Sequence, residues 1–397
     1  MKKLLVLCAV FMLFGCAKAI PLKEEIRGIW VPDPQYTDVL KSYQNVVNFV
    51  SSLDSLNFNS VYIVSYALSK TLYPSNVLLK NTNYSHIDST NMLAPFRPTY
   101  NKPTVSPSGD PVRDLIDEAH KRNIKVFFWY EFGFMADIKL ATPENNPILA
   151  KNPTWVGMGN DGKPASYNNH DFYFNAFDPA VQNYLLKIVE EGIKLYPDVD
   201  GIQGDDRMPA MCINSGYDAI TVARYKAEHK GINPPSDFKD SAWVRWRLDI
   251  LNKFGKTLYK KVKSVSPKAM VSFAPNPYPW CKENLMQEWP QWVSSGICDL
   301  LAVQCYRYDS IGYRNTVAQA QSFIKPKAHT KQLFVTGIIL MVSGKISDAQ
   351  QLKKQVLINR DLKTNGEIFF YNEGLRKPEI RAVIKELYPE KAIFPKL

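Results

Sequence analysis

Two adjacent aspartates and an arginine stand where an apolar run ends, in "VDGIQGDDR" at 199–207. Burying a charge without a partner costs on the order of several kcal/mol, so Asp205, Asp206 and Arg207 need either solvent or a function. One interpretation is a strand that emerges into a solvated loop. The other is a catalytic site, because paired carboxyl groups are what glycoside hydrolysis requires.

Polar side chains also end several other strand-like runs, and aromatic residues lie close to them in the sequence. The polar residues are Glu131, Asn276, Gln304, Tyr306 and Glu373, and the aromatic ones include Trp129, Tyr278 and Trp280. Taken singly, each has an ordinary explanation in solvent contact or helix capping. As a set on one rim, carboxyl groups and aromatic faces predict carbohydrate chemistry, since a sugar ring can lie on an aromatic face.

The elements that must position these residues recur regularly along the chain. Eight short runs are rich in apolar, β-branched and aromatic residues, at 27–31, 60–66, 124–132, 199–205, 269–276, 299–306, 333–340 and 366–373. Amphipathic stretches typical of helices separate them. This alternation predicts an α/β fold, a parallel (β/α)8 TIM barrel, as one domain over 25–390. An open doubly wound sheet is disfavoured because no glycine-rich phosphate turn follows an early strand.

Two connections are long, at 67–109 and 133–178, after the second and third predicted strands. Connections that follow strands lie at the C-terminal face of such a barrel, where barrel enzymes build their sites. Loops of this length usually shape a cleft. We therefore expect a cleft over the C-terminal ends of the strands.

The alternation of side chains along a strand gives the direction of Asp205. Ile202 suits the side that faces the helices, which places Gln203 and Asp205 toward the barrel axis and turns Asp206 outward or into the loop. Neighbouring strands lie about 4.8 Å apart, so Asp205 and Glu131 are predicted to face each other across the cleft. Asp205 is the expected nucleophile or base and Glu131 the general acid. Asp206 is the alternative for either role.

Six motifs along the chain resemble one known family. They are "EIRGIWV" at 25–31, "HKRNIKVFFWYEFGFM" at 120–135, "VDGIQGDD" at 199–206, "WVRWRLD" at 243–249, "VQCYRYD" at 303–309 and "IFFYNEGL" at 368–375. Together they are similar to the bacterial glycosyl-hydrolase-like family 10, whose members are secreted or lipid-anchored (β/α)8 proteins. The resemblance implies a glycosidase that acts in the cell envelope.

The chain departs from the family pattern in two places. Members commonly follow the aspartate pair with an aromatic residue or histidine, whereas Arg207 stands here, and the eighth strand usually ends "FFYE" rather than "FFYNE". An arginine beside two aspartates is expected to keep both ionised, while aromatic neighbours raise the pKa of Glu131 by desolvation. The second departure weakens a catalytic role for Glu373.

The remaining site predictions concern substrate and cofactors. Residues expected to bind substrate or tune charge are Trp129, Gln203, Arg207, Asn276, Trp280, Gln304, Tyr306 and Glu373. No metal or organic cofactor is expected. In particular, the spacing of Cys212, Cys281, Cys298 and Cys305 suits no zinc site, although Cys281 and Cys298 could form a disulfide.

The N-terminus reads as a targeting signal. "MKKLLVLCAVFMLFGC" combines two lysines, an apolar run and a cysteine preceded by glycine, which predicts a signal peptide over 1–16 with a lipobox and lipidation at Cys16. Phe14 is unusual for a lipobox, so plain secretion is the alternative. We expect a protein anchored by lipid in the bacterial cell envelope, at the periplasmic or outer-membrane face, and no other membrane contact.

Charge and composition leave open what the barrel does with a carbohydrate. The formal net charge is +11, but the basic residues are spread over many segments, which favours a solvated surface over nucleic-acid binding. A rival hypothesis is a non-catalytic carbohydrate-binding lipoprotein, because binding needs the same aromatic and polar residues. A third is attachment to peptidoglycan or an acidic polymer through the positive surface.

Overall fold

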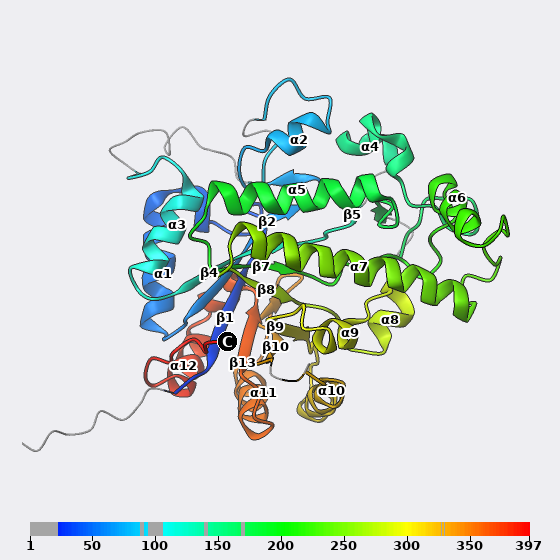
Figure 1. Ribbon diagram of the computed structural model, residues 1–397. Helices are drawn as coiled ribbons and strands as arrows, with labels where there is room; N and C mark the ends of the chain where they lie inside the picture. The colour runs from blue at the N-terminus through cyan, green and yellow to red at the C-terminus, as the bar shows by residue number, and fades with distance from the viewer. Residues whose placement is uncertain are drawn as a thin grey trace, which may run out of the picture.

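Eight parallel strands close into a barrel in the computed structural model, which describes residues 23–87, 91–93, 106–138, 142–167, 171–326, 328 and 330–397 (Figure 1). Each strand pairs with the next, and the last pairs with the first. In barrel order the strands are β1 (Ile26–Val31), β2 (Ser60–Ala67), β4 (Lys125–Tyr130), β7 (Gly201–Gly204), β8 (Met270–Phe273), β9 (Leu300–Gln304), β10 (Leu333–Ile339) and β13 (Gly366–Phe370). The predicted (β/α)8 fold is confirmed.

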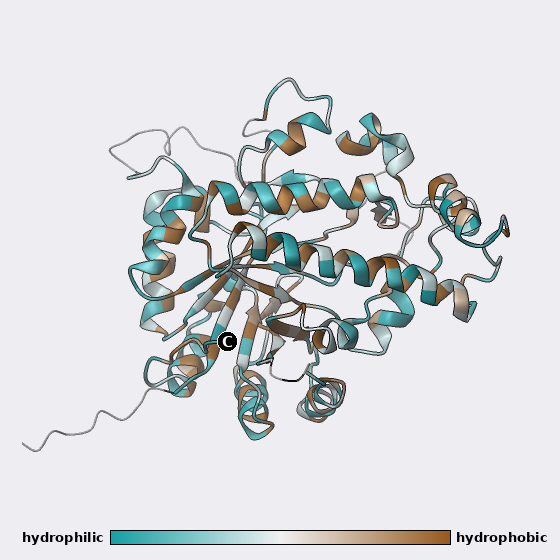
Figure 2. Ribbon diagram, in the orientation of Figure 1, coloured by the Kyte–Doolittle hydropathy of each residue, from teal (hydrophilic) through white to brown (hydrophobic). Residues whose placement is uncertain are grey.

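A helix follows every barrel strand and packs on its outer side. These helices are α1 (Tyr43–Ser55), α3 (Pro111–His120), α5 (Pro179–Leu195), α7 (Ser241–Val265), α9 (Trp289–Ser294), α10 (Ser310–Ser322), α11 (Ala349–Asp361) and α12 (Pro378–Leu387). Five of them, α3, α5, α7, α10 and α11, begin after an aspartate whose side chain accepts a hydrogen bond from a first-turn N–H group. Figure 2 shows apolar residues along the strands and on one side of α5 and α7, which pack against each other.

The two long connections carry structure of their own. The first holds β3 (Lys70–Thr71) and α2 (Asn76–Lys80), and the second holds β5 (Met135–Ile138), η2 (Pro143–Asn145), α4 (Pro147–Lys151), η3 (Pro153–Trp155) and β6 (Asp171–Tyr173). Smaller additions elsewhere are η1 (Val39–Lys41), α6 (Ala219–Glu228), α8 (Trp280–Leu285), β11 (Met341–Val342), β12 (Lys345–Ile346) and η4 (Asn372–Arg376). As predicted, the long connections after the second and third barrel strands follow C-terminal strand ends.

Aromatic side chains fill the inside of the barrel. The Trp30 ring lies 6.2 Å from that of Tyr62, which stacks on Phe127 at 4.6 Å. The indole N–H of Trp30 donates to the side-chain oxygen of the fully buried Gln203 (2.6 Å). A barrel packed this way is a solid core rather than a pore, so a ligand has access only to its mouth.

The N-terminal rim of the barrel is held by a repeated contact. At four places a side-chain oxygen of the residue before one strand accepts the backbone N–H of a neighbouring strand: Asn59 from Arg27, Asp200 from Val126, Asp299 from Val271 and Asn365 from Phe334, at 2.8–2.9 Å. Each contact satisfies an N–H group at a strand end. This rim is therefore built for stability.

The targeting and cysteine predictions have different outcomes. Residues 1–16, with Cys16, lie outside the described part of the chain. Cys281 and Cys298, which could have paired, are both buried and form no disulfide, and neither do the buried Cys212 and Cys305. Within the described ranges, no helix combines the length and apolar character that a membrane span requires.

Candidate active site

The two predicted catalytic carboxyl groups meet at the ends of neighbouring strands. β4 and β7 are paired with Tyr130 opposite Gly204, so the next residue on each strand, Glu131 and Asp205, lie side by side. The Asp205 carboxylate accepts the backbone N–H of Phe132 (2.9 Å) and of Arg207 (2.8 Å). These two contacts fix the Asp205 carboxylate against the backbone of the loop that carries Glu131.

The turn after Glu131 is strained in a way that serves this contact. Phe132 has a φ of +63°, a left-handed conformation that is unfavourable for a bulky side chain, and it points its N–H at Asp205. A Cβ on the following Gly133 would lie 2.4 Å from the Cβ of Met208. The β4 and β7 loops thus pack too closely for any residue but glycine at this position.

Glu131 has the environment of a proton donor. Burial and the neighbouring charge of Asp205 raise the pKa of its carboxyl group well above the usual value. The side chain is half-buried, and its oxygen atoms accept no hydrogen bond from any residue that the structure describes. A protonated, unengaged carboxyl group at the mouth of the barrel is free to donate to a ligand.

The pKa of Asp205 contradicts the prediction that Arg207 would keep both aspartates ionised. Burial and the charge of Asp206 raise the pKa of Asp205, and they outweigh the lowering effect of Arg207. The reason is that the guanidinium of Arg207 forms its ion pair with Asp206. Glu131 and Asp205 are therefore neighbouring carboxyl groups whose pKa values are both raised.

Asp206 is occupied by structural partners. It is 6% exposed, pairs with Arg207, and accepts a hydrogen bond from the Asn276 side chain (2.7 Å). Although burial favours a neutral guanidinium, the charge of Asp206 raises the pKa of Arg207, which stays positive. The Arg207 guanidinium also lies over the Phe132 ring, 5.6 Å from its centre. These contacts suit Asp206 for holding the loop after β7 and the Arg207 guanidinium in place.

Tyr306 reaches the same cluster from the end of β9. Burial and the charges of the Asp206, Glu131 and Asp205 carboxyl groups raise the pKa of its hydroxyl group well above the usual value. Its ring lies 5.6 Å from that of Phe370. The neighbouring predicted residue on β9, Gln304, is half-buried and donates to the backbone oxygen of Ala274 (2.8 Å).

Trp129 and Gln203 lie lower in the barrel and form the floor of the site. Trp129 is 4% exposed, packs 6.2 Å from Trp30, and leaves its indole N–H buried without a partner. Such orphan donors are rare, and a ligand hydroxyl group would satisfy this one. The Gln203 side chain, in contrast, accepts a hydrogen bond from Trp30 and donates one to Ser272. These contacts support the floor.

An exposed aromatic pair stands on the rim above. Trp280, at the start of α8, is 39% exposed and makes an edge-to-face contact with Tyr167 at 5.8 Å. Tyr167 is 41% exposed and belongs to the long connection after β4. Sequence reasoning found Trp280 but missed Tyr167, because only the fold brings that loop to α8.

Glu373 is not brought to the other carboxyl groups. The predicted eighth strand, 366–373, ends at Phe370, and the 3-10 helix η4 that follows breaks the alternation on which its direction was predicted. Glu373 accepts hydrogen bonds from Thr37 (2.8 Å) and Asn372 (3.0 Å) and pairs with Arg376. It lines a separate surface groove against α1.

Asp33 is a further carboxyl group at the mouth, missed in the sequence. It follows β1, is half-buried, and adds to the negative potential that raises the pKa of Glu131. Burial raises the pKa of Asp33 itself. A signal was present in "WVPD" at 30–33, where the aspartate stands two residues after the end of the first predicted strand.

Comparisons with known proteins identify the family of this chain. The model of the glycosyl hydrolase-like 10 family matches residues 25–355. Glycosyl hydrolase YngK of Bacillus subtilis is 21% identical across 94% of this chain and 74% of its own length. Glycosyl hydrolase DigH of Escherichia coli K12 is 23% identical across 87% and 79%.

Solved structures show the same fold. The glycoside hydrolase domain of PgaB (BpsB) from Bordetella bronchiseptica superposes with a TM-score of 0.62 at 15% identity, covering 94% of this chain and all of that one. A β-galactosidase from Rahnella sp. R3 gives 0.59 at 13% identity, covering 92% of this chain and 56% of that one. At these identities the likeness concerns the barrel alone.

Proposed function

The chain belongs to the glycosyl hydrolase-like 10 family, and from that premise we propose that it hydrolyses glycosidic bonds of a polysaccharide or oligosaccharide with Glu131 and Asp205. Membership implies a carbohydrate ligand and a glycosidase-like function. The observation that carries the catalytic proposal is the side-by-side placement of Glu131 and Asp205 at the ends of β4 and β7.

The environments of the two groups divide their roles. Glu131 has no hydrogen bond to a described residue and a raised pKa, so it holds a proton that it gives to the glycosidic oxygen as the bond to the anomeric carbon breaks. Asp205 accepts two backbone N–H groups, which favour its charged form once Glu131 carries the proton. Its carboxylate then attacks the anomeric carbon or takes a proton from the attacking water.

The surrounding groups bind and orient. The indole N–H of Trp129, which has no partner, and the hydroxyl group of Tyr306, which lies near the three carboxyl groups, would donate to sugar hydroxyl groups. Asn276 and Arg207 hold Asp206 in place. The Trp280–Tyr167 pair offers apolar faces to a sugar ring farther out on the rim.

The test is a screen of purified protein against a panel of glycans, with detection of new reducing ends. The proposal expects release from at least one glycan by the native protein and background release by Glu131→Gln. Binding to a glycan without release from any of them would favour the non-catalytic carbohydrate-binding alternative. Release that survives in Glu131→Gln would assign the acid role elsewhere.

We also propose that the protein is anchored in the bacterial cell envelope through lipid on Cys16. The support is the sequence "LFGC" after an apolar run. Intact mass of protein extracted from membranes is expected to show a mature chain that begins at Cys16 with added lipid mass. A mature N-terminus downstream of Cys16, without that mass, would replace anchoring by plain secretion.

A further inference from the structure

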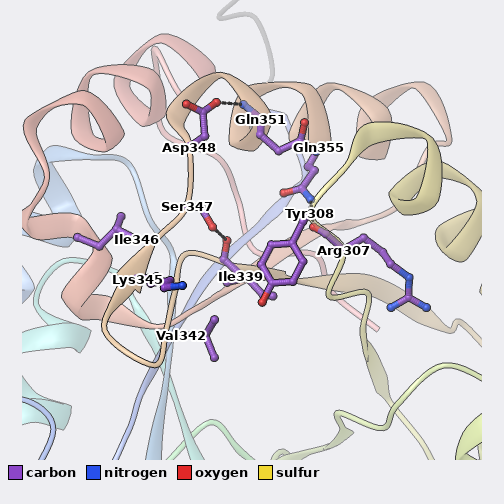
Figure 3. Close-up of a pocket in the computed structure, with 10 residues that line it drawn as sticks. All are labelled: Arg307, Tyr308, Ile339, Val342, Lys345, Ile346, Ser347, Asp348, Gln351 and Gln355. Atoms are coloured by element: carbon purple, nitrogen blue, oxygen red, sulfur yellow. Dashed lines mark hydrogen bonds between the residues drawn. The ribbon is translucent and has the colours of Figure 1, made fainter.

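A hollow lies on the C-terminal rim of the barrel, in the loops that follow β9 and β10. It has a volume of about 430 Å³ and is formed by the loop after β9, the end of β10, the β11–β12 hairpin and the start of α11 (Figure 3). Arg307, the first residue of its wall, directly follows Tyr306 and donates to the Tyr306 backbone oxygen (2.7 Å). The hollow and the candidate active site therefore share the loop after β9, with Tyr306 in the site and Arg307 in the wall of the hollow.

The walls of the hollow are held by hydrogen bonds, so it is preformed. Ser347 donates its hydroxyl group to the backbone oxygen of Ile339 (2.7 Å), which ties the hairpin to the end of β10. The Gln355 side chain donates to the backbone oxygen of Arg307 (2.8 Å), which ties α11 to the β9 loop. Preformed walls reduce the ordering that ligand binding would otherwise require.

The lining combines apolar surface with an open aromatic ring. Ile339, Val342 and Ile346 supply the apolar part. Tyr308 is 78% exposed, and its ring lies in the middle of the hollow (Figure 3). A large exposed aromatic side chain gains little from folding, whereas it offers a sugar ring a face to lie on.

The charges of the hollow select for an anion. Arg307 and Lys345 are both exposed and form no ion pair with a described residue, and Figure 3 shows them on opposite sides of the Tyr308 ring. The carboxylate that also lines the hollow, Asp348, is engaged as the N-cap of α11 and accepts the N–H of Gln351 (2.8 Å). At the wall, the Nε2 of Gln351 is buried without a partner.

We propose that this hollow is a second saccharide-binding pocket, and that it holds a sugar unit carrying a carboxylate some way along the chain from the bond that is cleaved. Tyr308 would stack on the ring, and Arg307 and Lys345 would pair with the anionic group. The inference deepens the proposed function, because the pocket would receive an outer unit of the same substrate chain. It names the substrate class as an acidic glycan.

The test measures binding rather than turnover, in a full-length Glu131→Gln background that leaves the probe intact. The probes are uronate-containing oligosaccharides, such as hexagalacturonate, each paired with its methyl ester, which keeps the sugar backbone and removes the charge. At low salt at least one acid is expected to bind about tenfold more tightly than its ester, and added salt reduces the difference. Equal binding of every acid and its ester would overturn the inference.

Variants test whether the preference for the acid over its ester arises in the hollow. Arg307→Gln combined with Lys345→Gln is expected to abolish the preference for the acid, and Tyr308→Ala to weaken acid and ester alike. Lys253→Gln combined with Lys256→Gln, two exposed lysines on α7, removes the same net charge elsewhere and should keep the preference. A preference lost equally in both charge variants would place it on the general surface charge and reject the pocket.

The result separates the two proposals. A protein that cleaves a glycan but binds acid and ester equally fails this inference alone. If the Glu131→Gln protein prefers the acid and loses this preference in the pocket variants, while the native protein cleaves nothing, the proposed hydrolysis alone fails.

Discussion

Two aspartates stand at opposite ends of β7 and have opposite environments. Asp200, just before the strand, is half-buried, which raises its pKa, but hydrogen bonds from His120 (2.8 Å), Lys125 (2.7 Å) and the backbone N–H of Val126 (2.8 Å) lower it below the usual value. Asp205, just after the strand, is buried, its nearest charged neighbours include other carboxyl groups, and its pKa is raised.

The difference between these ends indicates that one rim of the barrel serves stability and the other serves chemistry. At the N-terminal rim, Asp200 and Asp299 each accept a backbone N–H group and pair with a lysine, an arrangement that stabilises the folded state. At the C-terminal rim the chain gathers Asp33, Glu131, Asp205 and Asp206 around one arginine, an arrangement that costs stability and shifts proton affinities toward neutral pH. Barrels of this type place chemistry at the second rim.

The largest expected effect is a difference in kcat between variants at the two ends of β7. Asp205→Asn and Asp200→Asn make the same chemical change five residues apart. Asp205→Asn should lower kcat by about 10²–10⁴-fold, because it removes a group that acts on the reacting atoms. Asp200→Asn should change kcat less than about twofold, measured below its melting temperature. Similar losses in both variants would mean that the contrast between the rims has no catalytic meaning.

The same two variants should show the opposite order in stability, with the larger loss in Asp200→Asn. Asp200→Asn leaves His120 and Lys125 without their carboxylate, and we expect it to lower the free energy of unfolding by about 2 kcal/mol at pH 7. Asp205→Asn removes one of several crowded negative charges and should leave the free energy of unfolding equal or higher. Urea unfolding of both variants beside the native chain measures this. A larger loss for Asp205→Asn would contradict the assignment of the rims.

The pH dependence of these differences follows from the signs of the pKa shifts. The pKa of Asp200 is lowered on folding, so its contribution to stability is present above its unfolded pKa, about 4, and is lost as the pH falls through the lower folded value. The pKa of Asp205 is raised to about 8, so its cost to stability grows as the pH rises from its unfolded pKa, about 4, to the folded value, and levels off above it. The deficit of Asp200→Asn should therefore shrink toward pH 3, while any gain of Asp205→Asn should grow from about pH 4 and level off above about pH 8.

Much of this arrangement was predictable from the sequence. All eight barrel strands were found, because buried parallel strands are nearly continuous apolar runs. The placement of Glu131 and Asp205 directly after two paired strands followed from the adjacency of consecutive strands in a barrel. These inferences depend on backbone geometry alone, which the sequence pattern encodes well.

The rest depends on where chains turn and which rotamers side chains adopt. Glu373 was misplaced because β13 ends at Phe370 and a 3-10 helix follows. Asp33 was missed because one residue of turn separates it from a strand. The raised pKa of Asp205 was not predicted because Arg207 turned to Asp206, a choice between adjacent carboxylates that spacing does not encode.

Turnover itself should follow a bell-shaped pH profile displaced toward neutral pH. As the pH falls through the lower apparent pKa of the coupled pair, Asp205 becomes protonated and cannot attack or accept a proton. As the pH rises through the upper one, Glu131 loses the proton it must donate. Both values are raised, so the optimum in kcat/KM should lie above pH 4.3, the usual pKa of glutamate. A profile still at its maximum below pH 4 would contradict the crowding at this rim.

The smallest effect is expected from the rim residues outside the charge cluster. Trp280→Ala removes an exposed sugar-facing ring and should raise KM several-fold with little change in kcat, because stacking contributes equally to the ground and transition states. Trp280→Phe keeps an aromatic face and should recover most of the affinity. A large fall in kcat would place Trp280 among the groups that act on the reacting bond.

The coupling of the C-terminal carboxyl groups can be measured directly by carbon NMR titration of the Glu131 side chain. The native chain and Asp205→Asn would be labelled at glutamate carboxyl carbons, with Glu131→Gln identifying the resonance. We predict a Glu131 pKa well above 4.3 in the native chain and a clear fall in Asp205→Asn, because burial remains while the neighbouring charge is gone. A Glu131 carboxyl that titrates near its usual value in both proteins would contradict the central claim.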